Sequence, residues 1–209
     1  MSGPRIAALV LAAGASSRMR GSNKLLRAVQ GVPMIERAVS AAVGSRCSQV
    51  VVVTGWQADL VQSTVRAVPA FSDASNVAIV HNARYAEGLA SSIRCAVAAV
   101  ADDAEAVLVQ LADMPWLSSL DLNRLIDSFD PTAPSIVAPI RDGRRGNPVL
   151  WPRRHFAALT ALQGDSGARE LLLQLASEVR TVPFETDAIF ADVDTSEDLA
   201  MAQAPRPLR

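Results

Sequence analysis

The stretch IAALVLAAGASSRMRGSNK, which covers residues 6–24, decides how this chain folds. Its first six residues are uniformly apolar, as is typical of a strand buried on both faces of a parallel sheet. Small residues and then three cations follow, which predicts a loop at the carboxyl end of that strand. Arg5 and the apolar run also resemble a short secretory signal. We expect a strand, because a cationic loop of this kind needs one beneath it.

Short apolar runs alternate with amphipathic stretches, which is typical of a parallel sheet covered by helices. The strand-like runs are Ile6–Leu11, Val50–Thr54, Val77–His81, Ala106–Leu111, Ile136–Ala138 and, more weakly, Val179–Val182. The helical stretches are Met34–Val43, Ala58–Ala67, Ser91–Ala101, Leu120–Phe129 and a final one from Ser196. The pattern predicts one α/β domain over residues 1–203, a single-domain three-layer sandwich around a mostly parallel, Rossmann-like sheet. Residues 204–209 are expected to form a flexible tail.

The composition excludes several classes of protein. Half of the 209 residues are hydrophobic, 20% are charged and the formal net charge is −1. This balance argues against disorder and against binding to nucleic acid or a membrane through bulk charge. No apolar run approaches the roughly 20 residues that span a bilayer. Cys47 and Cys95 form neither a disulfide framework nor a zinc pattern, so we expect a cytoplasmic protein in a reducing environment.

The loop after the first strand is a candidate phosphate site. The small residues from Ala12 to Ser17 let the backbone approach a ligand, and their N–H groups can form an anion-binding concavity. Arg18, Arg20 and Lys24 add three cations within seven positions, which favours phosphate binding. A solvated turn with ordinary surface charges is the alternative. The spacing matches neither G-x-G-x-x-G nor the P-loop pattern, so it does not indicate a dinucleotide fold or a P-loop ATPase.

The sequence LVLAAGASSRMRGSNKLL, residues 9–26, resembles the signature loop of the nucleotidyltransferase superfamily that includes molybdenum cofactor cytidylyltransferases and guanylyltransferases. It is more distantly similar to sugar-1-phosphate nucleotidyltransferases. The resemblance implies a sheet of the nucleotide-diphospho-sugar transferase type and a loop that wraps the triphosphate of an NTP. It implies catalytic roles for Arg18 and Lys24. It also implies a nucleotide site that includes the loop residues Leu11, Ala12, Ala13, Gly14, Arg18 and Lys24.

Two carboxylates follow apolar runs further along the chain. Asp113 lies in QLADMP, residues 110–115, and Asp194 lies in ADVDTSEDL, residues 191–199. A carboxylate at a strand end suits Mg²⁺, whereas helix capping or an ordinary surface position is the alternative. Both motifs resemble metal-binding elements of the same superfamily. The resemblance implies that Asp113 and Asp194 hold Mg²⁺, or Mn²⁺, and that Asp113 is catalytic, while Asp192 receives no role.

Three further segments resemble elements of this superfamily. HNARYAEGLASSIR, residues 81–94, is similar to its nucleotide-binding segment, which implies that Gly88 and Ser91 contact the nucleotide. Residues 146–151 and 162–169 are similar to elements on its acceptor side, which implies acceptor-binding roles for Asn147, Asp165 and Arg169. Helix capping by Ser91 and structural roles for Asn147 and Arg169 are the alternatives.

The alternation of strands and helices weakens after about residue 140. A basic loop leads into residues 148–151, and Gly164-Asp165-Ser166-Gly167 separates two helical segments, with Ser166 as a candidate cap for the second. His81 is expected to be a strand-end residue with a satisfied hydrogen bond. His155 is expected at an exposed helix start and receives no role.

The resemblance implies an Mg-dependent enzyme that transfers CMP from CTP to the terminal phosphate of molybdopterin and releases pyrophosphate. Ala13 favours CTP, because a Cβ at this position can narrow the base pocket for a pyrimidine. The alternatives are a guanylyl- or other nucleotidyltransferase with a different phosphorylated acceptor, an NAD(P)H-dependent oxidoreductase of the same family, and a non-catalytic factor that holds the pterin. The expected partners are CTP, a molybdopterin-type acceptor and a molybdoenzyme or insertion chaperone.

Overall fold

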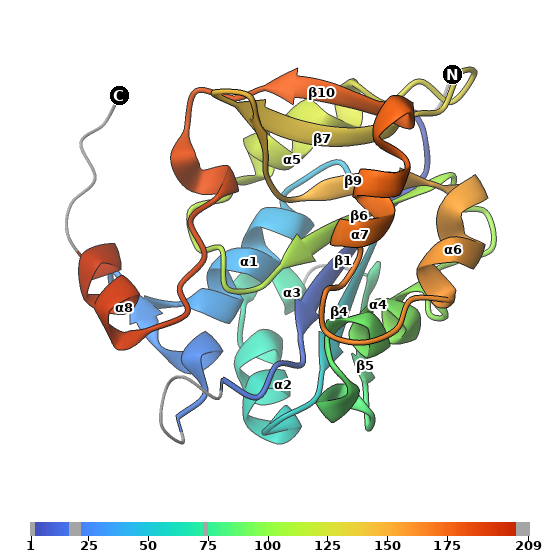
Figure 1. The fold of residues 1–209 in the computed structure, drawn as a ribbon. Coiled ribbons are helices and arrows are strands. Elements are labelled where there is room, and N and C mark those ends of the chain that lie inside the picture. Colours follow the sequence, from blue (N-terminus) through green and yellow to red (C-terminus); the bar gives the residue numbers. More distant parts are fainter. Residues whose placement is uncertain (1–2, 17–21, 73–74, 204–209) are drawn as a thin grey trace.

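The computed structural model describes residues 3–16, 22–72 and 75–203. They form an α/β domain around an eight-stranded sheet with the order β10-β7-β9-β6-β1-β4-β5, in which β8 pairs with β7 (Figure 1). The strands of this sheet are β1 (Ile6–Ala12), β4 (Gln49–Thr54), β5 (Val77–His81), β6 (Ala106–Leu111), β7 (Ile136–Arg141), β8 (Arg144–Arg145), β9 (Val149–Pro152) and β10 (Val179–Pro183). A separate hairpin consists of β2 (Ala28–Val29) and β3 (Val32–Pro33).

Helices connect most of these strands. The α-helices are α1 (Met34–Val43), α2 (Ala58–Arg66), α3 (Pro69–Ser72), α4 (Leu89–Val97), α5 (Ser119–Asp127), α6 (Phe156–Thr160), α7 (Arg169–Gln174) and α8 (Ser196–Gln203). The 3-10 helices are η2 (Lys24–Leu26), η3 (Tyr85–Glu87), η4 (Arg153–His155), η5 (Ala176–Glu178) and η6 (Asp187–Ile189). Figure 1 shows α8 set apart from the sheet, next to the β2–β3 hairpin.

The sheet is mostly parallel, with β1 near its middle. β1 is parallel to β4 on one side and to β6 on the other, and β5 continues the parallel pairing beyond β4. β9 is antiparallel to both β6 and β7, while β10 is parallel to β7. Leu11 lies beside Val53 of β4 and Leu111 of β6. The carboxyl ends of these three strands therefore meet at one edge of the sheet.

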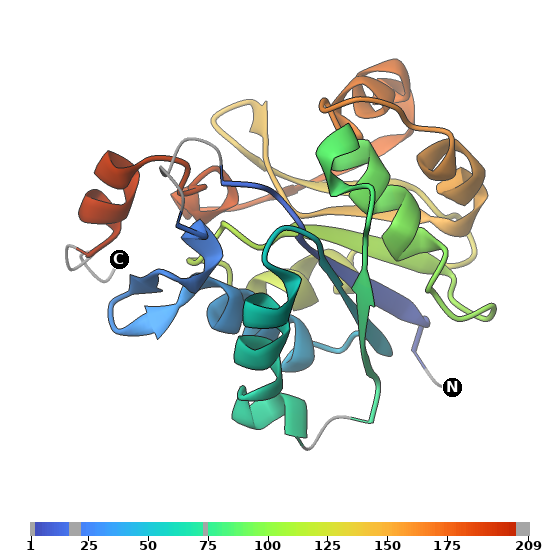
Figure 2. The same cartoon turned by 90° about the horizontal axis from the view of Figure 1, so that it is seen from below.

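Helices cover both faces of the sheet and complete three layers. α1, α2 and α5 pack on one face, and α4, α6 and α7 pack on the other (Figures 1 and 2). Because side chains alternate along a strand, Ala8 and Val10 of β1 join the first layer, whereas Leu9 and Leu11 join the second. This double burial explains why β1 carries no polar residue.

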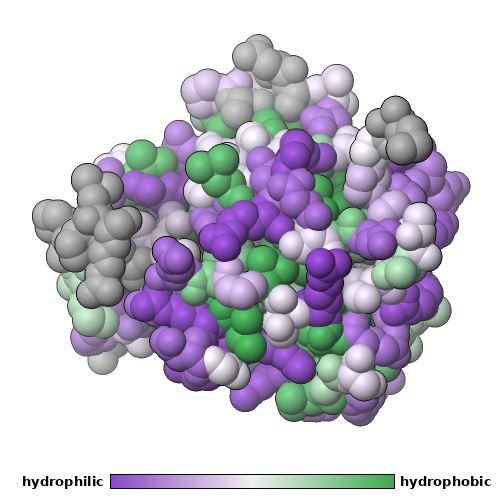
Figure 3. Space-filling model, turned by 90° about the horizontal axis from the view of Figure 1, so that it is seen from above, coloured by the Kyte–Doolittle hydropathy of each residue, from purple (hydrophilic) through white to green (hydrophobic). Residues whose placement is uncertain are grey.

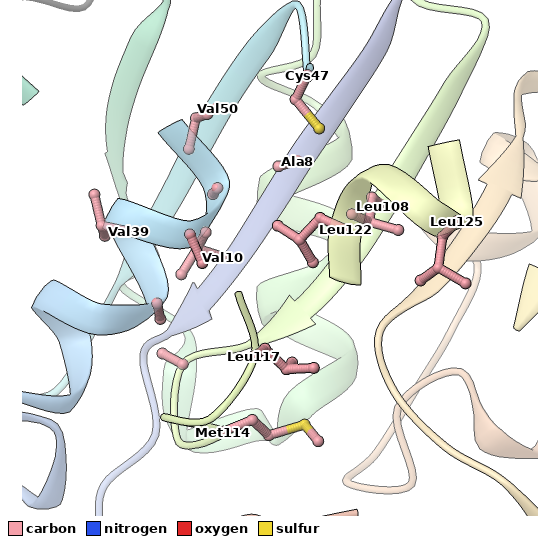
Figure 4. Close-up of a cluster of buried hydrophobic side chains, with 14 of the residues drawn as sticks. Ala8, Val10, Val39, Cys47, Val50, Leu108, Met114, Leu117, Leu122 and Leu125 are labelled. Carbon is pink, nitrogen blue, oxygen red and sulfur yellow. The ribbon is translucent and has the colours of Figure 1, made fainter. Parts of the chain in front are cut away.

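Aliphatic side chains fill the layer between the sheet and α1, α2 and α5. Figure 4 shows Ala8 and Val10 of β1, Leu108 of β6, and Leu122 and Leu125 of α5 gathered there. Each of these five residues is 0% exposed. Close packing of small aliphatic residues thus forms a core in a chain of which only 4% is aromatic.

The predicted fold class is confirmed, and the predicted strands and helices differ from the observed ones by at most four residues. β1 is a central strand, as expected from its apolar sequence. The sequence pattern did not indicate β9, because its four residues are too few to show a period and it enters the sheet without a helical crossover. The boundaries expected at residues 203 and 204 stay a prediction, since residues 204–209 lie outside the described ranges.

Two expectations for the carboxyl-terminal third are wrong. Ala168, not Ser166, is the residue that precedes α7 as its cap, and the carbonyl of Ser166 accepts the N–H of Arg169 at 3.3 Å. His155 is 7% exposed rather than at the surface. Its ring meets the edge of Trp151 with the centroids 6.1 Å apart, which draws it into the core.

Figure 3, which views the molecule from above relative to Figure 1, shows mostly hydrophilic side chains with small hydrophobic areas between them. Across the described ranges, no helix combines the length and the apolar character that crossing a membrane requires.

We predict that Leu122→Ala lowers the free energy of unfolding by about 2–5 kcal/mol, because it leaves a cavity between α5 and the sheet. Leu120 lies in the same helix and is 73% exposed. Leu120→Ala should therefore change the free energy by less than about 0.5 kcal/mol. Urea denaturation followed by circular dichroism measures both variants, and equal losses would contradict the observed packing of α5.

Candidate active site

A pocket of about 750 Å³ opens where the carboxyl ends of β1 and β6 meet. This volume lies within the range of about 300–1,000 Å³ that is typical of small-molecule sites, and ligands of open α/β sheets bind at this edge. Its walls come from the chain after β1, after β5 and after β6, and from two loops of the carboxyl-terminal third. They include Leu11, Ala13, Gly14, Lys24, Tyr85, Glu87, Gly88, Ser92, Leu111, Asp113, Asp165, Asp192 and Asp194.

The only lysine of the sequence lies between two carboxylates in this pocket. Lys24 Nζ donates to Asp113 Oδ2 and to Asp194 Oδ1, each at 2.6 Å. The side chains of Lys24, Asp113 and Asp194 are 13%, 19% and 33% exposed. Lys24 is 89 positions from Asp113 and 170 positions from Asp194. The fold thus brings three of the predicted site residues into direct contact.

Backbone hydrogen bonds hold the two carboxylates side by side. The carbonyl of Asp113 accepts the N–H of Val193 at 3.0 Å, which places the segment with Asp194 next to the end of β6. Asp198 Oδ2 accepts the N–H groups of Asp194 at 3.1 Å and Thr195 at 2.8 Å. Thr195 Oγ1 accepts the N–H of Asp198 at 3.1 Å. This reciprocal capping at the start of α8 fixes the backbone of Asp194.

The backbone of Lys24 is fixed as well, at the start of η2. Its N–H donates to Ser16 Oγ at 3.1 Å. The preceding residue, Asn23, is buried, and its side chain accepts the N–H of Leu25 at 3.1 Å and donates to the carbonyl of Trp56 at 3.3 Å. The loop is therefore fastened both to its own beginning and to the chain after β4. Lys24 reaches the carboxylates from an anchored backbone.

The pocket is strongly acidic in the part of the chain that the structure describes. The described pocket lining holds one ammonium group, that of Lys24, and five carboxylates, which belong to Glu87, Asp113, Asp165, Asp192 and Asp194. Glu87 also pairs with Arg84 and Arg94. Burial by itself would lower the pKa of Lys24, but the charges and hydrogen bonds of Asp113 and Asp194 raise it above the ordinary value. Burial, together with the charges of Asp113 and Asp194, raises the pKa of Asp192. A polyphosphate therefore needs further positive charge to enter this pocket.

The two carboxylates around Lys24 fit a divalent cation. Their oxygens converge on one positive centre, and Asp113 Oδ1 is buried without a hydrogen-bond partner. Mg²⁺ typically takes one or two protein carboxylates and completes its shell with phosphate oxygens and water. Within the described ranges, no group of three or more His, Cys, Asp or Glu residues could hold a metal.

The expected nucleotide side and acceptor side meet at Gly88. Asp165 Oδ1 accepts the N–H of Leu89 at 3.2 Å, and the carbonyl of Gly164 accepts the N–H of Ala90 at 3.1 Å, so this loop caps the start of α4. Gly88 has a φ of 97°, and a Cβ there would lie 2.6 Å from the Gly164 oxygen. Only glycine allows this approach.

The other predicted residues lie at different distances from the pocket. Leu11 and Gly14 line it, and Ala13 borders it while only 2% exposed. Ala12 is buried beneath it in the core. Ser91 is also buried, where its hydroxyl donates to the carbonyl of Gly88 and accepts from the Asn82 amide, both at 2.8 Å.

The remaining predicted residues lie outside this pocket or outside the described ranges. Asn147 and Arg169 do not line the pocket, and the N–H of Asn147 donates to the carbonyl of Ile189 at 2.9 Å. The predicted catalytic and nucleotide-binding role of Arg18 cannot be placed, because residues 17–21 lie outside the described ranges. Arg20, to which no role is assigned, also lies outside the described ranges.

Several residues of the site received no role from the sequence. Glu87 and Tyr85 line the pocket through η3, a 3-10 turn that no hydrophobic period indicates. Asp192 and Asp194 both line the pocket. Two residues that are two positions apart in an extended segment lie on the same side of the chain. Asn23 shapes the loop from beneath, and its position just before a helical turn is the signal that could have revealed it.

The fold and the pocket are those of a nucleotidyltransferase: a mostly parallel α/β sheet with Lys24 and two carboxylates at its carboxyl edge. The chain belongs to the family of MobA-like NTP transferase domains, whose model matches residues 8–179.

Similar proteins span almost the whole chain. Molybdenum cofactor cytidylyltransferase of Escherichia coli K12 is 28% identical over 195 residues, covering 93% of this chain and 94% of that protein. Nicotine blue oxidoreductase of Paenarthrobacter nicotinovorans is 31% identical over 202 residues, covering 94% and 95%. The crystal structure of Rv0371c from Mycobacterium tuberculosis H37Rv superposes with a TM-score of 0.81 at 27% identity, covering 97% of this chain and 99% of that chain. A manganese complex of the same protein superposes with a TM-score of 0.78 at 24% identity, covering 97% and 99%.

We predict that Gly88→Ala destabilises the protein more than Gly143→Ala, by roughly 1–3 kcal/mol. The two glycines have φ values of 97° and 74°, so alanine strains the backbone at both. A Cβ at Gly143 meets nothing within 4 Å, whereas one at Gly88 would collide with Gly164. Urea denaturation compares the two variants. Equal destabilisation would show that the loop around Gly164 does not press on Gly88.

Proposed function

We propose that this protein transfers CMP from CTP to the terminal phosphate of a molybdopterin-type acceptor and releases pyrophosphate. The observation that carries this proposal is the contact of Lys24 with Asp113 and Asp194 inside a pocket at the carboxyl edge of the sheet. One cation and two carboxylates that converge on a single point supply what a triphosphate and its divalent ion require. The similarity to the E. coli cytidylyltransferase supports CTP and the pterin acceptor.

Each group has a definite task in this reaction. A phosphate oxygen of the acceptor attacks the α-phosphorus of CTP, the bond to the β-phosphate oxygen breaks, and pyrophosphate leaves. Because a phosphomonoester is already ionised near neutral pH, the attack needs no histidine base. Lys24 binds triphosphate oxygens and stabilises the charge that develops on them. Arg18 is expected to do the same from the loop.

Asp113 and Asp194 would hold Mg²⁺, or Mn²⁺, which when bound neutralises phosphate charge and orients the triphosphate for in-line attack. The acidic lining favours this proposal, since a triphosphate would otherwise be repelled by five carboxylates. The manganese complex of Rv0371c is consistent with a divalent ion in this fold. The protein's own share of the task is to hold the two carboxylates together through Val193 and Asp198.

The choice of CTP depends on the resemblance more than on the pocket. The methyl group of Ala13 faces Gly55, where a Cβ would lie 2.8 Å from it, and Ala13 is only 2% exposed. This methyl group therefore offers little surface to a base, and GTP or another NTP with a different phosphorylated acceptor is the rival within the class. A pterin nucleotide made in this way would pass to a molybdoenzyme or insertion chaperone in the cytoplasm.

A second candidate function is an NAD(P)H-dependent oxidoreductase. It is favoured by the 31% identity to nicotine blue oxidoreductase over 94% of the chain. The sequence contains no G-x-G-x-x-G fingerprint after a strand, which counts against a nicotinamide site of the usual kind.

We predict that, with Mg²⁺ and molybdopterin present, CTP gives a higher kcat/KM for pyrophosphate release than GTP, ATP or UTP. Parallel reactions with each NTP and a coupled pyrophosphate assay measure this. A preference for GTP would instead support a guanylyltransferase that acts on a different phosphorylated acceptor. Oxidation of NADPH without pyrophosphate release from any NTP would instead support the oxidoreductase.

We predict that Asp113→Asn lowers turnover by roughly a hundredfold or more, because it removes one of two metal-binding carboxylates. Asp127→Asn is the matched control, since Asp127 pairs with Arg46 at the surface, away from the pocket. Steady-state kinetics and circular dichroism of both variants separate loss of catalysis from loss of folding. Near-normal, metal-dependent turnover of Asp113→Asn would remove Asp113 from the site.

A further inference from the structure

Lys24 occupies the same place that the metal needs. Its Nζ is 2.6 Å from an oxygen of Asp113 and 2.6 Å from an oxygen of Asp194. A Mg²⁺ ion bound to both oxygens would lie about 2.0–2.1 Å from each. An ion and an ammonium group cannot share this small space between the two carboxylates.

We propose that the ammonium group of Lys24 occupies the divalent-cation site until the nucleotide arrives, and that the triphosphate draws Lys24 away so that the metal can bind. Lys24 is then a positioning residue for the metal as well as a ligand of the triphosphate. This inference rests on the proposed nucleotidyl transfer. It adds that metal and NTP bind cooperatively, and it names the side chain that couples them.

The energetics of the exchange favour this order. A metal that binds alone must break both ion pairs of an ammonium group that is only 13% exposed. The displaced ammonium would lose the two hydrogen bonds that hold it between the two carboxylates. A triphosphate offers Lys24 anionic oxygens in place of those that it leaves, so one set of ion pairs replaces another. The metal then binds Asp113, Asp194 and a phosphate together.

The local structure allows this movement without a change of fold. Ser16 and Asn23 fasten the backbone at Lys24, whereas its four-carbon stem has free rotation about each bond. Asp194 and Asp113 keep their places through Asp198 and Val193, as described above. The exchange therefore requires only that one side chain swings within a pocket of about 750 Å³.

Two neutral substitutions at Lys24 test this inference by metal binding in the absence of any substrate. Electron paramagnetic resonance of free Mn²⁺ gives its dissociation constant for the metal-free protein. Lys24→Met should bind Mn²⁺ roughly tenfold or more tightly than the unchanged protein, since a neighbouring cation alters the affinity of a carboxylate for a proton by about ten- to a thousandfold. Lys24→Gln should behave alike, and it supplies a polar, neutral side chain if methionine prevents folding.

Arg46→Gln is the matched control, because it removes one positive charge that pairs with Asp127 at the surface. Its affinity for Mn²⁺ should equal that of the unchanged protein. CTP should then tighten Mn²⁺ binding to the unchanged protein and to Arg46→Gln, but much less to Lys24→Met, because coupling between two ligands is reciprocal and depends on the shared residue. Equal affinity of Lys24→Met and the unchanged protein for Mn²⁺ alone would overturn the inference.

The single lysine provides a direct observation as well. Protein labelled with ¹³C at lysine Cε gives one side-chain signal, that of Lys24. Mg²⁺ alone should leave this signal in place at concentrations where Mg²⁺ with CTP shifts it. A shift with Mg²⁺ alone, equal to that with Mg²⁺ and CTP, would contradict the order of binding. If no NTP binds and none is turned over, the proposed function is wrong. The Mn²⁺ affinities of Lys24→Met and the unchanged protein, measured without substrate, still test the role of Lys24 in that case.

Discussion

Two carboxylates at adjacent positions of a partly buried pocket repel each other, and the ammonium group of Lys24 lies between them. Several hydrogen bonds of the site fix the backbones that carry these three residues. The carbonyl of Asp113 holds Val193, Asp198 caps the segment that carries Asp194, and Ser16 and Asn23 anchor the backbone from which Lys24 extends. The same geometry that stabilises the metal-free pocket also presents two carboxylate oxygens to one point, which is what a divalent ion requires.

The sheet makes this contact possible because β1 and β6 are neighbouring parallel strands. Their carboxyl ends lie at one edge, so the loop after β1 and the turn after β6 face each other, although nearly a hundred residues separate them. Helices on both faces bury β1 fully, which gives the loop a rigid base. In the proposed reaction, this acidic lining favours an NTP that brings its own metal ion.

Patterns of residue type predicted much of this arrangement. They did not predict features that depend on contacts between distant segments. Lys24 and Asp113 follow apolar runs, so their place at the ligand edge could be read from the sequence. The sequence did not predict β9 and η3, because segments of this length are too short to show a hydrophobic period. His155 shows the limit most clearly: it was expected at an exposed helix start, yet it is buried and its ring contacts Trp151. Asn147, which was expected at the acceptor side, lies outside the pocket that Asp165 lines, and its acceptor-binding role stays a prediction.

The sequence alone determined the order of strands and helices, the aliphatic core, the family resemblance and most of the charged residues of the site, because hydrophobic period and short motifs are local properties of a chain. The tertiary structure alone decided that Lys24 contacts Asp113 and Asp194, that Asp165 caps α4, and that β9 enters the sheet antiparallel. These depend on distances between segments far apart in the chain, and no local pattern contains such distances. Which charges neutralise one another is therefore a property of the folded molecule.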